Sequence, residues 1–173
     1  MDKTYDFYTQ DIADFHLPRW NEFPEIELYI DQVTTFLQSN LLLFYPEAKT
    51  SFLTPSMINN YVKQGILERP EKKKYNRSHL AHLFVICILK RLFSIADIGK
   101  SISCMKKEYS VEDGYNLFCE ELEHALRRAF GTEAFPKKIA DEEDSRSITA
   151  LKAISQAFAS LVLSEQLLAL REQ

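Results

Sequence analysis

Hydrophobic positions recur at helical spacing along most of the chain. Apolar residues three and four positions apart mark five segments, which are 24–41, 54–63, 77–92, 110–130 and 148–171. Only four glycines and six prolines occur in 173 residues, which favours helices over a turn-rich β architecture. The pattern therefore predicts an all-α fold.

The segment from Thr54 to Gly65 is the most informative of these helices. Thr54 suits the N-cap, Pro55 suits the first helical position, and Gly65 suits a left-handed residue just after the helix. One face is apolar and contains Met57, Ile58, Tyr61 and Val62. The opposite face is polar and almost uncharged, and contains Ser56, Asn59, Asn60 and Lys63.

That polar face has two interpretations, and this helix alone leaves both open. A solvated face is the first, although solvated helix faces usually carry glutamate and lysine. The second is a face that reads DNA, because an asparagine side chain presents a donor and an acceptor that match an adenine edge in the major groove.

A short extended segment and a basic connection follow this helix. Residues 66–70 are predicted to be extended, and Glu71-Lys72-Lys73-Lys74-Tyr75 to form a tight basic connection. Asn76 suits the N-cap of the next helix, and Ser94 with Asp97 forms a capping-box-like start of another short helix.

Basic charge is concentrated around this connection. Residues 63–107 carry eleven basic and three acidic side chains, whereas the whole chain has a net charge of -4. We therefore predict phosphate contacts by Lys63, Lys72, Lys73, Lys74 and Arg77. For the three consecutive lysines taken alone, a solvated basic loop is the alternative.

A series of residues between positions 48 and 98 stands at a characteristic spacing. It contains Ala48-Lys49, Tyr61, Gly65, Ile66-Leu67, Pro70, Tyr75, Leu80, Leu83, Ile86, Leu89 and Phe93-Ser94-Ile95-Ala96-Asp97-Ile98. In this series the chain resembles the DNA-binding head of the MerR regulators. The runs Met57–Lys63 and Lys72–Tyr75 resemble more closely a bacterial family known as domain of unknown function 1836.

The MerR resemblance implies a winged helix-turn-helix with a short wing that binds double-stranded DNA. A first helix would begin at Pro46 and run through Lys49, and the 54–63 helix would place Ser56, Asn59 and Asn60 against base edges. The sequence departs from the MerR pattern at Phe52, which stands in place of a turn glycine. It also departs at Asn59 and Asn60, which replace an arginine and a tyrosine.

Three regions are predicted along the chain. Residues 1–24 form an irregular arm, 25–107 the DNA-binding domain, and 108–173 a helical body. In the 24–41 helix, one side contains Ile26, Tyr29, Ile30, Val33 and Leu37. The last helix is apolar over most of its circumference, so it must be covered nearly all round. We therefore predict a homodimer joined mainly through residues 110–173, with coverage by the chain's own helices as the alternative.

The common enzyme motifs are absent from the sequence. It has no glycine-rich phosphate loop, no Gly-x-Ser-x-Gly and no His-Glu-x-x-His, so no catalytic, cofactor-binding or metal-binding residues are predicted. His79 and His82 are interpreted as facing solvent or lying near phosphates. Glu123 and His124 are interpreted as part of the wet side of their helix.

Composition bears on the compartment and the function. The three cysteines are widely spaced, which favours reduced thiols in the cytoplasm, and neither a signal peptide nor a membrane span is predicted. The predicted function is a transcriptional regulator that binds duplex DNA, and no effector is predicted. The alternative is a non-enzymatic adaptor whose basic face binds an acidic protein.

Overall fold

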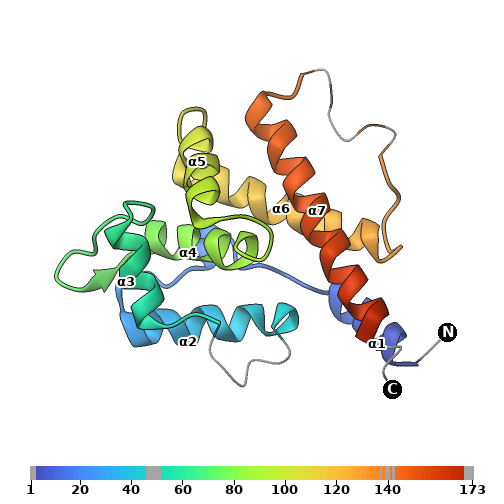
Figure 1. Cartoon of the computed structure of the whole chain (residues 1–173), viewed down its shortest axis with the longest axis horizontal. Helices are drawn as coiled ribbons and strands as arrows, with labels where there is room; N and C mark the ends of the chain where they lie inside the picture. The colour runs from blue at the N-terminus through green and yellow to red at the C-terminus, as the bar shows by residue number, and fades with distance from the viewer. Residues whose placement is uncertain (1–2, 46–51, 137, 139–140, 142, 170–173) are drawn as a thin grey trace. The chain divides into compact units, whose positions relative to one another are not determined.

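The computed structural model describes residues 3–45, 52–136, 138, 141 and 143–169 (Figure 1). The chain is mostly helical with one small antiparallel sheet, so the all-α class is confirmed. It divides into two compact units. We call Pro18–Asn116 the central unit, and Met1–Leu17 together with Leu117–Gln173 the terminal unit.

The central unit is built around helix α4. Its elements are η1 (Trp20–Glu22), β1 (Leu28–Tyr29), α2 (Ile30–Leu41), η2 (Leu42–Phe44), α3 (Pro55–Lys63), β2 (Lys74–Tyr75), α4 (Arg77–Leu89), α5 (Ile95–Met105) and the beginning of α6 (Val111–Ala129). Helix α4 contacts α2, α5 and β2, and it is buried from His79 to Leu89 except at Val85. An apolar helix enclosed on nearly all sides forms the core of this unit.

The predicted N-terminal caps of three helices are confirmed. The side chain of Thr54 accepts a hydrogen bond from the Met57 N–H at 3.2 Å, and Asn76 accepts one from the His79 N–H at 3.2 Å. Ser94 caps α5 in the same way. Each cap satisfies a backbone donor that the first helical turn leaves unpaired.

The predicted ending of α3 at Gly65 is also confirmed. Gly65 has a φ of 73°, a left-handed conformation that costs glycine little. The carbonyl of Tyr61 accepts from the N–H of Ile66 at 3.0 Å, and the carbonyl of Val62 accepts from the N–H of Gly65 at 3.1 Å. This pair of bonds is a Schellman motif, which fixes the direction in which the chain leaves the helix.

The prediction of one helix over 24–41 is wrong at its beginning. Leu28 and Tyr29 form strand β1, which pairs antiparallel with β2 in the register Leu28 with Tyr75 and Tyr29 with Lys74. Helix α2 begins only at Ile30, and Ile26 and Tyr29 are exposed. Pairing with a segment about 45 positions further along the chain overrides the local helical pattern.

The predicted irregular arm contains a helix, α1 (Lys3–Ala13). The ring of Tyr8 lies 5.7 Å from the ring of Phe130, and Ile12 is buried. Tyr8 and Ile12 are four positions apart and therefore lie on one face of α1. Packing of this face within the terminal unit stabilises a helix that the sequence pattern did not predict.

Helix α7 (Arg146–Ala169) is covered along one stripe only. Its buried positions are Ser147, Leu151, Ser155, Phe158, Ala159 and Val162. Leu167 and Leu168 are exposed to 46% and 61%, so the described chain does not provide the all-round coverage that the sequence predicts. By length and composition alone α7 could cross a membrane, with a mean hydropathy of 1.3 over 18 residues, a criterion that core helices of soluble proteins also meet.

Candidate nucleic-acid interface

The two faces of α3 differ in burial as predicted. Ile58 and Tyr61 are buried, and Met57 and Val62 are half-buried. The opposite face is exposed at Ser56, Asn59, Asn60 and Lys63. Within the described part of the chain, the side chains of Ser56, Asn59 and Asn60 make no hydrogen bond. Their donors and acceptors are therefore available to a ligand.

Tyr61 belongs to the core of the central unit. It is 3% exposed, and burial, with a smaller contribution from the neighbouring Cys87 thiol, raises the pKa of its hydroxyl to about 12. Its backbone carbonyl also accepts from the N–H groups of Ile66 and Leu67. The residue therefore holds α3 in place, and its carbonyl ties the bend at Ile66 and Leu67 to the end of the helix.

The basic connection is a tight turn, which we call the basic hairpin (Glu71–Lys74). The N–H of Lys74 donates to the carbonyl of Glu71 at 2.8 Å, and the central residues Lys72 and Lys73 have φ values of 47° and 63°. Positive φ at both central residues matches a type I′ hairpin turn, which favours asparagine and glycine. A lysine in this conformation costs roughly 1 kcal/mol. The chain therefore keeps two exposed charges at a strained tip.

Lys74 and Arg77 lie at the base of this hairpin and are half-buried. The amine of Lys74 lies 5.8 Å from the ring centroid of Tyr29 in β1. The guanidinium of Arg77 donates to the carbonyls of Phe23 at 3.2 Å and Pro24 at 3.4 Å. These contacts hold the hairpin against the preceding chain, so Lys63, Lys72 and Lys73 are the more accessible of the five basic side chains.

Two of the three acidic residues in the basic region, Glu68 and Asp97, are paired within it, whereas the third, Glu71, forms no ion pair with a described residue. Glu68 lies 3.0 Å from Lys106, whose hydrogen bond and charge lower the pKa of the Glu68 carboxyl, and Asp97 lies 2.8 Å from Lys100. Lys63, Lys72 and Lys73 form no ion pair with any residue that the structure describes. No ion pair among the described residues therefore neutralises their positive charge.

Helix α2 links α3 to the strand at the base of the basic hairpin. It contacts both α3 and β2, and it buries Val33, Leu37 and Leu41. The predicted short helix at 46–49, with its Ala48-Lys49 pair, lies outside the described residues. The helix that precedes and supports α3 in the described structure is α2.

An aromatic stack stands where the MerR pattern has a turn glycine. The rings of Tyr45 and Phe52 are parallel to within 8° with centroids 3.9 Å apart. The amine of Lys90 lies 5.6 Å from the centroid of Phe52 and donates to its backbone carbonyl. Burial lowers the pKa of Lys90. Sequence reasoning missed this corner, because nothing in the pattern links positions 45, 52 and 90.

The interpretation of His79 and His82 as solvent-facing or near phosphates is wrong. They are 5% and 7% exposed, because the helix that carries them is enclosed on nearly all sides. Burial lowers the pKa of both imidazoles. Among the described residues, no group of three or more His, Cys, Asp or Glu side chains is placed to hold a metal ion.

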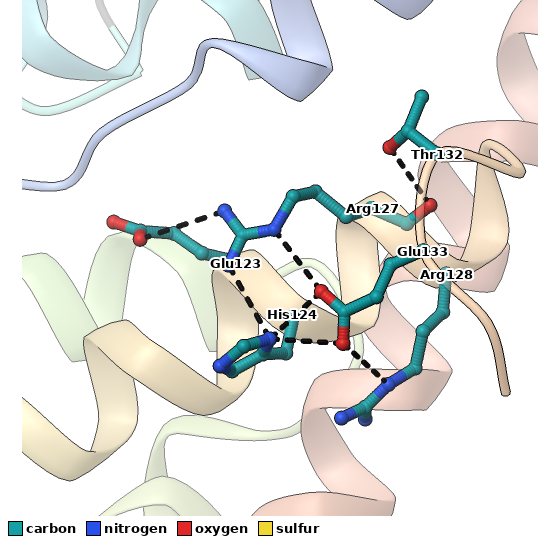
Figure 2. A network of polar contacts seen from close by, with 6 residues as sticks. All are labelled: Glu123, His124, Arg127, Arg128, Thr132 and Glu133. Atoms are coloured by element: carbon teal, nitrogen blue, oxygen red, sulfur yellow. Dashed lines mark hydrogen bonds and ion pairs between the residues drawn. The ribbon is translucent and has the colours of Figure 1, made fainter. Parts of the chain in front are cut away.

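A polar network closes the end of α6 in the terminal unit (Figure 2). The carboxylate of Glu133 lies 2.8 Å from His124 Nδ1 and 3.2 Å from Arg127 Nε. Burial opposes charge on Glu133, yet the hydrogen bonds from His124 and Arg127 lower its pKa overall. The carboxylate of Glu123, predicted to be on the wet side of the helix, is buried and accepts from the Leu17 N–H at 2.9 Å.

The fold and this surface define an all-α protein with an exposed polar helix face beside a basic hairpin. The chain belongs to the family described as domain of unknown function 1836 (DUF1836), whose model matches residues 18–122. The match includes the whole central unit and therefore both parts of the surface. No curated protein and no solved structure matches the chain.

Proposed function

We propose that this protein is a transcriptional regulator that binds duplex DNA through a MerR-like winged helix-turn-helix. The observation that carries the proposal is the exposed row of Ser56, Asn59 and Asn60, whose side chains make no hydrogen bond with the described chain. Their helix is anchored by buried Ile58 and Tyr61 on its other face. A rigid helix that presents free amides is suited to reading base edges in the major groove.

The order of the elements supports this assignment. Helix α2 packs against α3, the hairpin follows α3, and the hairpin strand β2 pairs with β1. In the proposed reading α2 is the supporting helix, α3 the recognition helix and the basic hairpin the wing. The short wing exposes Lys72 and Lys73, which together with Lys63 bind the phosphates on either side of the bases read by α3.

Dimerisation completes the proposal. A helix of nine residues contacts only a few base pairs, so specificity needs two half-sites about 34 Å apart. The exposed Leu167 and Leu168 of α7 supply an apolar surface for a second copy of the chain. A regulator of this kind acts on DNA in the cytoplasm, where its three free cysteines stay reduced.

Selection of bound fragments from a random duplex library tests the proposal. We expect the full chain to enrich a palindromic sequence, and Asn59→Ala or Asn60→Ala to lose about 1–3 kcal/mol of discrimination at one position of each half-site. Gln64→Ala, which removes another exposed polar side chain near the end of α3, is the matched control and keeps the same sequence. If nothing is enriched and the chain instead retains an acidic protein, the adaptor function replaces this one.

A further inference from the structure

A histidine takes the place of a glutamate or glutamine in the capping box of α4. The N–H of His79 donates to Asn76 Oδ1 at 3.2 Å, and the N–H of Asn76 donates to His79 Nδ1 at 3.1 Å. Two backbone donors are satisfied reciprocally in this way. The second bond, however, depends on the protonation state of the imidazole.

His79 Nδ1 faces a donor and an acceptor of the same residue. It lies 3.1 Å from the Asn76 N and 2.7 Å from Asn76 Oδ1. A neutral ring with its proton on Nε2 can accept from the Asn76 N–H. An imidazolium carries a proton on both nitrogens and can only donate, so Nδ1 donates to Oδ1, which already lies 2.7 Å away, and the Asn76 N–H loses its acceptor.

The surroundings of His79 favour the neutral ring at pH 7. Burial disfavours the charge, and the positive end of the helix dipole adds to this effect. The carboxylates of Glu68 and Glu27 favour the proton on His79. At His82, the Glu68 carboxylate favours the proton, whereas the amine of Lys106 and the ring of His79 oppose it. His79 Nε2 is buried and has no hydrogen-bond partner among the described residues, although the Glu68 backbone lies nearby.

This capping box is the joint between the basic hairpin and the core. Asn76 follows strand β2 directly, and the ring of Tyr75 meets the imidazole of His79 edge-on with centroids 5.4 Å apart. Tyr75 is itself buried, and its partner in the sheet is Leu28. A change at His79 therefore acts on the residues that fix the base of the hairpin.

We propose that protonation of His79 opens the capping box with Asn76 and loosens the basic hairpin, so that mild acid weakens duplex binding. This inference rests on the proposed function, because it assigns a regulatory role to a residue beneath the same surface. The signal is a drop in pH from neutrality. The element that responds is the junction of β2 and α4.

The test compares duplex affinity at about pH 7.5 and about pH 5.5 for three full-length chains, at fixed ionic strength. In His79→Gln, glutamine keeps the capping box and does not titrate. His82→Gln is the matched control, because His82 is equally buried but donates from Nδ1 to the Ser78 carbonyl at 2.6 Å. We expect the wild type and His82→Gln to lose roughly fivefold in affinity, the size of a lost cap, and His79→Gln to lose none. Equal losses in all three chains overturn the proposal.

A nuclear magnetic resonance titration separates the switch from DNA binding. As the pH is lowered in the free protein, we expect the backbone N–H resonance of Asn76 to shift with the same midpoint as the His79 imidazole resonances. An Asn76 amide that stays constant while His79 titrates overturns the opening of the capping box. A chain that binds no duplex at either pH overturns the proposed function and its coupling to His79, while the Asn76 resonance still decides whether the box opens.

Discussion

The N–H of Lys74 donates to the carbonyl of Glu71 at 2.8 Å and closes a turn whose two central residues are both left-handed lysines. Asparagine followed by glycine would adopt this turn with little strain. Lys72 and Lys73 keep two exposed charges there at a cost in stability. Under the proposed function, the two lysines are kept despite this cost because their charges bind phosphates.

Relieving the strain at Lys72 and Lys73 should raise stability and lower duplex affinity. Replacing Lys72 with Asn and Lys73 with Gly is expected to raise the free energy of unfolding by about 1–2 kcal/mol, because both positions then suit a positive φ. The same change should weaken duplex binding, since two phosphate ligands are lost. Urea denaturation and fluorescence anisotropy measure the two effects. Lys107→Asn, which removes an exposed lysine elsewhere, should leave stability unchanged.

Tyr61 is expected to matter for packing and not for contact with bases. Tyr61→Phe keeps the buried ring and should change stability only slightly, whereas Tyr61→Ala should lower the free energy of unfolding by about 3–5 kcal/mol. Thermal melts of the two variants check this. A Tyr61→Ala chain that melts like the wild type contradicts the packing role.

Stability should fall as the pH drops below neutrality. The folded-state pKa values of His79 and His82 are lower than the ordinary value of 6.5, so the unfolded chain binds more protons as the pH falls through 6.5. The stability that the two neutral histidines give at pH 7 is lost between that value and their lower folded-state pKa values. Urea denaturation at about pH 7.5, 6.5 and 5.5 measures the loss. In the double variant His79→Gln, His82→Gln, the free energy of unfolding should depend less on pH than in the wild type. If the pH dependence of stability in that variant equals that of the wild type, the two histidines are not its cause.

The dimer is tested at the exposed end of α7. Leu167→Lys with Leu168→Lys should give soluble, folded monomers, because both side chains are exposed in a single chain, to 46% and 61%. Analytical ultracentrifugation at micromolar concentration measures the mass, which for one chain is 20.1 kDa. Ala153→Lys adds charge to the same helix without removing these leucines, and it should remain dimeric. A wild-type chain that is monomeric with and without duplex contradicts the proposal.

Local features of the fold could be read from the sequence. The caps at Thr54, Asn76 and Ser94 and the glycine after α3 follow from short-range backbone chemistry, so the residues alone specify them. The two-faced character of α3 also follows from spacing alone. For that reason the sequence predicts which side chains of α3 are exposed and which are buried.

Features that depend on distant partners could not be read in this way. Strand β1 exists because it pairs with β2, and the corner at Phe52 is built with Tyr45 and Lys90. The burial of His79 follows from enclosure of α4 by several elements. Spacing along one helix does not reveal what covers it.

The most direct test of DNA binding is a salt titration of duplex affinity. A random duplex of about 20 base pairs is titrated with two full-length chains, the wild type and the triple variant Lys63→Ala, Lys72→Ala, Lys73→Ala, over a series of salt concentrations. We expect tight binding in low salt for the wild type. For the variant we expect a slope of log affinity against log salt that is smaller in magnitude by about 0.9 for each contact removed. Absence of binding by the wild type in low salt, or identical slopes for the two chains, would contradict this expectation.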